Sequence, residues 1–279
     1  MNSDPNRFAQ KRLTEIALME EGFLPLDEAA LLLAIEIGED AGIQQYLNRI
    51  DSLAEDFNLY RQSVPEITGA KAMISFFYKE TGFAGNKSNY FDPANSYLNK
   101  VIDNRVGIPI SLAILQMSIG ARLDIPVEGI GFPGHFLVRY KEDGGSLVDP
   151  FFGRELNTHD CKTLLKQISG GRLELDNTHL RVATKREILV RLIDNLKSIF
   201  WRKKEWKQCQ RCIENQILLS QKKSQFELQL GAVFEMRGAQ PKAERKYKEI
   251  ITDQEFSEDI RSIAIKRLSS FARQPTVIH

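Results

Sequence analysis

The chain has 279 residues, of which 42% are hydrophobic and 27% charged, a composition typical of a globular protein with a sizeable core. Its 38 Lys and Arg residues balance 37 Asp and Glu residues, which excludes the broad positive field that holds nucleic acid or an anionic membrane. The short basic run at 201–207 is interpreted as the solvated end of a helical hairpin.

The N-terminal residues 1–13 contain no apolar stretch that would make a signal peptide or an anchor. The most apolar run, 108–119, is far shorter than the roughly 20 residues of a membrane span. We therefore expect a cytoplasmic protein. The three cysteines show no disulfide framework and no paired metal-ligand spacing, so we expect neither a disulfide, a metal nor a cofactor.

The first hundred residues predict helices. Apolar positions recur at helical spacing from 27 to 57 with a break at 38–42, and a third apolar helix is expected over 71–79. Polar turn clusters then interrupt the pattern. Asp92 followed by Pro93 is typical of an N-cap with proline at the first helical position.

A helix is expected from Pro109 to about residue 123, after which the character of the chain changes. Residues 127–153 are rich in β-branched and aromatic residues bounded by glycines, with an Asp-Gly-Gly turn at 143–145. This pattern is typical of strands joined by a hairpin. We expect it to be the only sheet in the chain.

From about residue 184 the pattern is helical again and repeats with a period of 34 residues. The shift superposes Leu196 on Leu230, Phe200 on Phe234, Cys209 on Ala243 and Ile213 on Tyr247. This spacing resembles the tetratricopeptide repeat. We place a first domain at 1–182 and a repeat domain at 183–279, with helices from about 185 and over 258–271 as its caps.

His135 and Asp149 stand on either side of the predicted hairpin turn. In an antiparallel pair of strands that turns near 142–144, the two residues lie opposite or diagonal to each other. Both have odd numbers, so strand alternation places both side chains on the same face of the sheet. A histidine oriented by a carboxylate makes up two thirds of a nucleophilic triad. A hydrogen-bonded structural histidine has the same appearance, so both interpretations stay open.

The order GIPISLAIL, PGHFLVRY and LVDPFFG resembles the transglutaminase-like core, in which a Gly-x-Cys-x-x-x-Ala helix start precedes a His strand and an Asp strand. With NSYLN at 95–99 and the repeats, the chain resembles the SirB family of bacterial transglutaminase-like proteins over about 24–253. The resemblance implies an α+β fold: a helical N-terminal region, a transglutaminase-like (papain-like) core with a small antiparallel sheet, and all-helical repeats.

The resemblance also implies site positions. His135 falls on the general base and Asp149 on its orienting carboxylate. The nucleophilic cysteine, four residues before Ala113, falls on Pro109, which has no group that attacks a carbonyl. Asn95 is a binding candidate by resemblance. Pro109 is a second, because the start of its helix offers backbone N–H groups to an anion.

Ser111 could replace the cysteine only if its hydroxyl reached His135. It lies about 200° around the helix from Pro109 and shares a polar stripe with Ser118 and Arg122, so we expect it to face away.

The cysteines are interpreted as packing residues. Cys161 follows a helix start beside His159, but this local pair carries little information without a family context. Cys209 and Cys212 lie inside a repeat helix with no second pair of ligands, which disfavours a zinc or redox site.

Two functions remain. The first is a non-catalytic transglutaminase-like protein, a pseudoenzyme that acts as a protein-interaction or regulatory scaffold and binds a protein or peptide through its repeats. The alternative is an amide hydrolase or acyltransferase with His135 as base, Asp149 as orienter, and Ser111 or an activated water as nucleophile. The proline at 109 favours the first. We expect no nucleic-acid or membrane partner.

Overall fold

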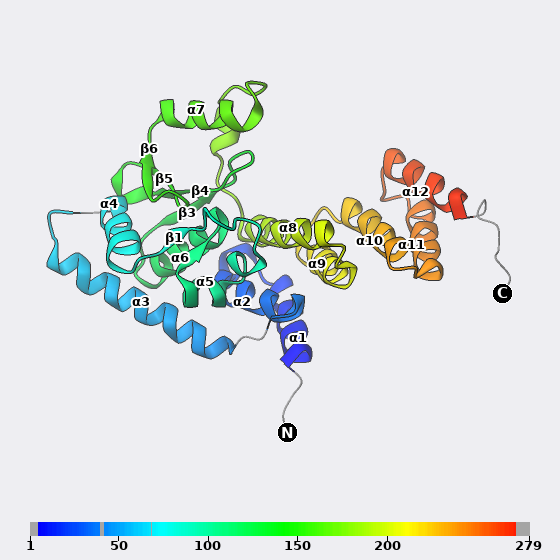
Figure 1. Cartoon of the computed structure of the whole chain (residues 1–279), viewed down its shortest axis with the longest axis horizontal. Coiled ribbons are helices and arrows are strands. Elements are labelled where there is room, and N and C mark those ends of the chain that lie inside the picture. Colours follow the sequence, from blue (N-terminus) through cyan, green and yellow to red (C-terminus); the bar gives the residue numbers. More distant parts are fainter. Residues whose placement is uncertain (1–4, 40–41, 68, 272–279) are drawn as a thin grey trace. The chain divides into compact units, whose positions relative to one another are not determined.

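The computed structural model describes residues 5–39, 42–67 and 69–271. The chain divides into two compact units, Met1–Leu192 and Ile193–His279, and the division falls inside one helix, α8 (Lys185–Lys203). Figure 1 shows helices around a small sheet in the first unit and a succession of helices in the second. Within the described ranges, no helix is long and apolar enough to cross a bilayer.

The N-terminal region is helical, as predicted. Its elements are α1 (Pro5–Ala17), η1 (Glu21–Phe23), α2 (Leu26–Ile37), α3 (Ile43–Ser63), α4 (Gly69–Ile74) and the π-helical η2 (Ser75–Glu80). Because α2 is apolar on nearly every side, it is buried among α1, α3, α5 and α6. The predicted break at 38–42 separates α2 from α3; residues 40 and 41 lie outside the described part of the chain.

The helix that carries the predicted nucleophile position is α6 (Pro109–Arg122), and it follows η3 (Pro93–Asn95) and α5 (Leu98–Asn104). The predicted cap at Asp92 is confirmed, since its carboxylate accepts a hydrogen bond from the Ala94 N–H at 3.0 Å. Directly before α6, β2 (Val106–Gly107) pairs in parallel with β1 (Ala84–Gly85). The prediction of a single sheet is therefore wrong, and β1 also contradicts the prediction that the first hundred residues are all helical. Strands of two residues are too short to show an alternating pattern in the sequence.

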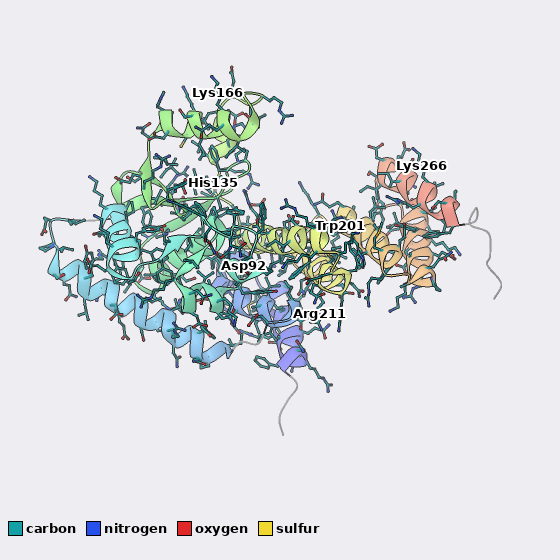
Figure 2. All side chains as sticks on the ribbon, viewed as in Figure 1. Asp92, His135, Lys166, Trp201, Arg211 and Lys266 are labelled. Carbon is teal, nitrogen blue, oxygen red and sulfur yellow. The ribbon has the colours of Figure 1, made fainter. Side chains whose placement is uncertain are left out.

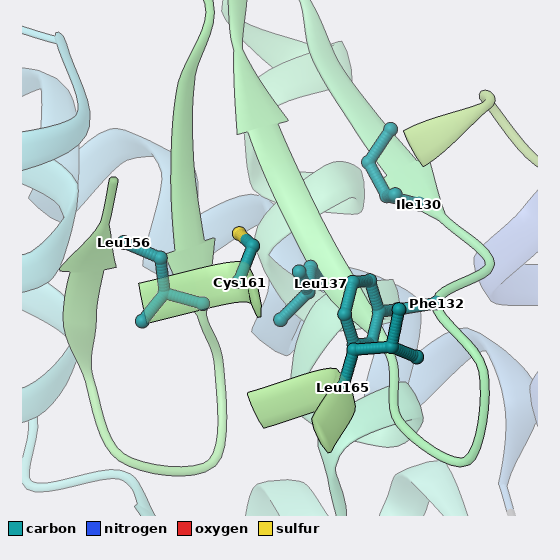
Figure 3. Close-up of a cluster of buried hydrophobic side chains, with 6 residues drawn as sticks. All are labelled: Ile130, Phe132, Leu137, Leu156, Cys161 and Leu165. Atoms are coloured by element: carbon teal, nitrogen blue, oxygen red, sulfur yellow. The ribbon is translucent and has the colours of Figure 1, made fainter. Parts of the chain in front are cut away.

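The main sheet is antiparallel in the order β3 (Val127–Ile130), β4 (Leu137–Tyr140), β5 (Ser146–Asp149) and β6 (Arg154–Leu156). Helix α6 packs on β3 and β4. A Cβ on Gly120 of α6 would lie 2.7 Å from a methyl of Val127, so glycine permits the close approach of α6 to β3. A cluster on the sheet and on α7 (Thr158–Ser169) closes the core beside it (Figure 3); it consists of Ile130, Phe132, Leu137, Leu156, Cys161 and Leu165. These layers confirm the α+β fold.

The second unit contains the end of α8, then α9 (Trp206–Leu219), α10 (Ser224–Met236), α11 (Gln240–Thr252) and α12 (Glu258–Phe271). Successive helices from α9 onward pack against each other. All the residues superposed by the 34-residue shift are buried, as a repeating core requires. The predicted helix from about residue 185 is confirmed as α8, which runs on through Leu196 and Phe200; its role as a cap stays a prediction.

Candidate functional site

His135 lies in the turn that leads into β4, and Figure 2 labels its position. Gly134 has a left-handed φ of 65°, and a Cβ there would lie 2.4 Å from a methyl of Ile168, so the turn requires glycine. The His135 N–H donates to the Phe132 carbonyl at 3.1 Å. Arg191 donates to the carbonyls of both residues. The imidazole is therefore presented by a well-fixed backbone, with 12% of its surface exposed.

Asp149 ends β5 and is completely buried. Its Oδ1 accepts hydrogen bonds from the N–H groups of Phe151 at 2.9 Å and Phe152 at 3.3 Å. Its carbonyl accepts from the Gly153 N–H at 2.9 Å. Gly153 has a φ of 64°, and a Cβ there would meet the Tyr78 ring at 2.7 Å. One carboxylate thus organises the turn after β5 while Oδ2 stays directed toward the histidine.

The structure brings His135 and Asp149 together. The β4–β5 register pairs Val138 with Val148, which places residue 135 diagonal to residue 149. Nε2 lies 3.0 Å from Oδ2; both atoms are buried, and they lack the alignment of a hydrogen bond. Within the described ranges Nδ1 makes no hydrogen bond to the chain. Nδ1 is therefore the nitrogen left for a ligand or substrate.

The predicted nucleophile position holds Pro109, the buried first residue of α6. The neighbouring Ser111 hydroxyl is also buried, and its hydrogen bonds within the described ranges go to backbone groups of Asn95 and Ile108. It donates to the Asn95 carbonyl at 2.6 Å and accepts from the Ile108 N–H at 3.1 Å. No hydrogen bond joins Ser111 to His135 in the described part of the chain. The hydroxyl fastens the start of α6 to η3.

Asn95 is buried, and its side chain holds the loop that precedes it. Nδ2 donates to the carbonyls of Asn89 at 2.7 Å and Tyr90 at 3.2 Å. Oδ1 accepts from Asn86 at 2.9 Å. Both polar ends of the amide are thus occupied within the chain, and Asn95 links the Ser111 contact to the position of Tyr90.

Sequence reasoning missed the aromatic residues next to the site. The ring centroids of Tyr90 and Phe151 lie 5.8 Å apart, so the loop before η3 meets the turn that follows Asp149. Burial raises the pKa of Tyr90 above its ordinary value, against a smaller opposing effect of Arg191. The available signal was the mirrored pair YFDP at 90–93 and DPFF at 149–152: adjacent aromatics in turns, without the spacing of a helix or strand core.

A series of buried side-chain hydrogen bonds ends at the turn that follows Asp149. The Tyr140 hydroxyl donates to Oε1 of Gln116 at 2.6 Å, whose Nε2 donates to the Tyr78 hydroxyl at 2.8 Å. Tyr78 in turn donates to the Pro150 carbonyl at 2.6 Å. Burial, with a smaller contribution from the charge of Asp149, raises the pKa of Tyr78 above its ordinary range, so it stays a neutral donor.

The cysteines offer no substitute nucleophile. Cys161, Cys209 and Cys212 are all buried, and burial raises the pKa of each thiol above its ordinary value. Asn157 caps the helix of Cys161, accepting from the Asp160 N–H at 3.0 Å. Among the described residues, no cluster of three or more His, Cys, Asp or Glu side chains could hold a metal.

Known proteins share both the motif region and much of the chain around it. The model of the transglutaminase-like superfamily matches residues 44–194. A UPF0162 protein of Xylella fastidiosa (strain 9a5c) is 36% identical over 209 residues, which cover 71% of this chain and 73% of that protein. Protein SirB1 of Salmonella typhimurium is 30% identical over 154 residues, covering 54% and 56%.

The similarity extends to a eukaryotic protein. F-box only protein 21 of Homo sapiens is 31% identical over 138 residues, which cover 46% of this chain and 21% of that protein. No solved structure matches. Since the family model spans more than half of the chain and the Xylella relative aligns over more than two thirds of both proteins, the chain belongs to the transglutaminase-like superfamily, with SirB1 and the UPF0162 proteins as relatives.

Proposed function

We propose that this chain is a non-catalytic transglutaminase-like protein that acts as a protein-interaction or regulatory scaffold. The proposal rests on the nucleophile position that the family resemblance implies. Pro109 has no attacking group there, and the nearby Ser111 hydroxyl donates its proton to the Asn95 carbonyl. A nucleophile needs its base within hydrogen-bond reach, and Ser111 has no hydrogen bond to His135 in the described ranges.

The retained pair of His135 and Asp149 has a binding role in this proposal. The buried carboxylate lies against Nε2, and Nδ1 is left without a partner from the described chain. An imidazole in this setting can donate to or accept from a ligand group without any bond being broken.

The protein or peptide partner binds through the repeats in this proposal. Helical hairpins stacked in series present extended surfaces that commonly receive peptides. The match to F-box only protein 21, which covers 21% of that protein, supports the interpretation of the transglutaminase-like region as a module that works beside others.

An activity probe tests the loss of catalysis. The purified full-length chain is incubated with an acyl-directed covalent probe, and separately with activated esters and anilides, beside its His135→Ala variant. We expect neither labelling nor turnover that depends on His135. Labelling or hydrolysis that disappears in His135→Ala contradicts the proposal and supports the alternative, an amide hydrolase or acyltransferase.

The site of partner binding is tested by photo-crosslinking in cells. A benzophenone amino acid replaces Met236, 48% exposed on α10, or, as the control, Leu59, 63% exposed on α3. We expect a discrete crosslinked protein with the probe at position 236 and none at position 59. Crosslinking at position 59 alone places the partner elsewhere.

A further inference from the structure

An exposed group of aromatic rings lies beside the His135–Asp149 pair; we call it the aromatic patch, and it consists of Tyr90, Phe91, Phe151 and Phe152. Three of its members keep large exposed fractions: 38% for Tyr90, 54% for Phe91 and 53% for Phe152. Clustered exposed aromatics are unusual on a protein surface without a binding role. Aromatic side chains are also the commonest anchors of interfaces.

The aromatic patch is held rigidly from below. Gly85 of β1 leaves room for Phe151, since a Cβ on this glycine would lie 2.5 Å from the ring. Asp149 accepts hydrogen bonds from the N–H groups of Phe151 and Phe152, and Asn95 donates to the carbonyl of Tyr90. A surface fixed in this way loses little conformational entropy when a partner binds.

Two cations stand over the same exposed ring. The Lys87 ammonium lies 5.3 Å, and the Arg154 guanidinium 5.9 Å, from the centroid of Phe152. Neither makes an ion pair with any carboxylate of the described residues. Asp149, the register partner of Arg154, is buried and accepts from Phe151 and Phe152. Asp92 accepts from Asn89 and Ala94. The next acid, Glu155, follows Arg154 in β6 and so points to the opposite face of that strand.

We propose that the aromatic patch, with Lys87 and Arg154, binds an acidic peptide segment in which an aromatic or aliphatic side chain stands between carboxylates. The apolar side chain would pack on the rings, and the carboxylates would pair with the two cations. This proposal goes beyond the function proposed above, which places the partner on the repeats.

The ring geometry favours a peptide over a nucleic acid. The rings meet each other at interplanar angles of 79°, 60° and 82°: two contacts are edge to face and the Tyr90–Phe151 contact is tilted, so the rings present no series of parallel platforms. Binding of single strands combines stacking platforms with a positively charged groove. This chain has a net charge of +1 and two cations at the patch.

Fluorescence anisotropy on the full-length chain tests the proposal. The probe is a fluorescein-labelled heptapeptide with a central phenylalanine flanked by aspartates; matched peptides carry asparagines or lysines instead. We expect binding of the aspartate peptide alone, weakened by added salt. Phe152→Ala should weaken it about tenfold, and Lys87→Glu with Arg154→Glu should abolish it and transfer binding to the lysine peptide.

The control variant combines Phe23→Ala with Lys222→Glu, an exposed aromatic and an exposed lysine far from the patch in sequence, and should bind like wild type. Circular dichroism and melting temperature confirm that each variant folds.

No binding of the aspartate peptide by wild type, or unchanged binding by the patch variants, overturns the proposal. Tighter binding of a labelled oligonucleotide, or a dimer in sedimentation that Phe152→Ala dissociates, assigns the patch to another partner and overturns it as well. None of these results alters the acyl-probe test of the proposed function.

Discussion

Asp149 is the residue on which the geometry of the site depends most. Its carboxylate accepts two backbone N–H groups on one oxygen and faces His135 with the other, and it is completely buried. Removing one partner from such an arrangement leaves buried groups without hydrogen bonds, which costs more than the bonds themselves contribute. The turn, the aromatic patch and the histidine therefore share one support.

Asp149→Ala should lower the free energy of unfolding by about 3 kcal/mol, because it leaves two N–H groups without their acceptor and removes the buried carboxylate that faces the imidazole. Asp149→Asn keeps an acceptor for those N–H groups and should cost about 1 kcal/mol. Urea denaturation measures both. Asp51→Ala, which removes an exposed ion pair with Arg122, is the control and should cost less than about 1 kcal/mol. Equal losses for alanine and asparagine contradict this account.

The thiol of Cys209 makes stability depend on pH. Burial, with a smaller contribution from Glu205, raises the pKa of Cys209 to about 11 from 9.0. The folded state therefore keeps this proton to higher pH than the unfolded state, and the free energy of unfolding falls as pH rises from about 9 to about 11.

Alanine is the matched replacement for Cys209, because the 34-residue repeat superposes Cys209 on the buried Ala243. Cys209→Ala should reduce the slope of unfolding free energy against pH in that window, by at most about 1.4 kcal/mol per pH unit. Urea titrations under reducing conditions at several pH values measure it. Identical slopes in both proteins show that the thiol does not ionise on unfolding.

Sequence alone could predict the meeting of His135 and Asp149, because strand alternation places residues of equal parity on one face. It could also predict that the Ser111 hydroxyl makes no hydrogen bond to His135 in the described ranges, from its angle around α6. It could not predict that Tyr90 meets Phe151. That contact joins loops 61 residues apart in the chain, and no local periodicity encodes it.

At the scale of elements, the helices were predictable and the shortest strands were not. The repeat helices have apolar residues at regular spacing over more than ten positions, whereas β1 and β2 contain two residues each. The pairing of β1 with β2 depends on the steric room around Gly85 and not on a periodic pattern in the sequence. Gly85 has to be glycine because Phe151 occupies the place of its side chain.

Packing between α10 and α11 depends on one glycine. A Cβ on Gly231 would lie 2.5 Å from the ring of Tyr247, which is itself completely buried. Gly231→Ala should therefore lower the free energy of unfolding by about 1–3 kcal/mol, although alanine favours an isolated helix by up to about 1 kcal/mol.

The matched variant adds Tyr247→Leu. If the ring causes the cost, the two substitutions couple, and the double variant loses less than the sum of the single losses. Hydrogen exchange locates the effect: protection should fall in α9 to α12 and stay unchanged in β4 and β5. A stabilised Gly231→Ala protein contradicts the close contact.

At the scale of the whole molecule, a transglutaminase-like region is joined to a succession of helices. Compactness divides the chain after Leu192, inside α8. The predicted boundary at 182/183 lies before the start of α8 and remains a prediction about folding units. The central claim concerns the first unit: it keeps the histidine and the carboxylate of a cysteine-type site, and Pro109 occupies the position of the nucleophile.

The most direct test restores that nucleophile. In Pro109→Cys the rate of alkylation by iodoacetamide is measured against pH, alone and combined with His135→Ala, with Ser111→Cys as the control. The native thiols are buried and give a low background. We predict that Pro109→Cys reacts rapidly below pH 7, that His135→Ala removes this reactivity, and that Ser111→Cys stays inert. An inert thiol at 109, or a reactive thiol at 111 that depends on His135, would contradict the placement of Pro109 at the nucleophile position.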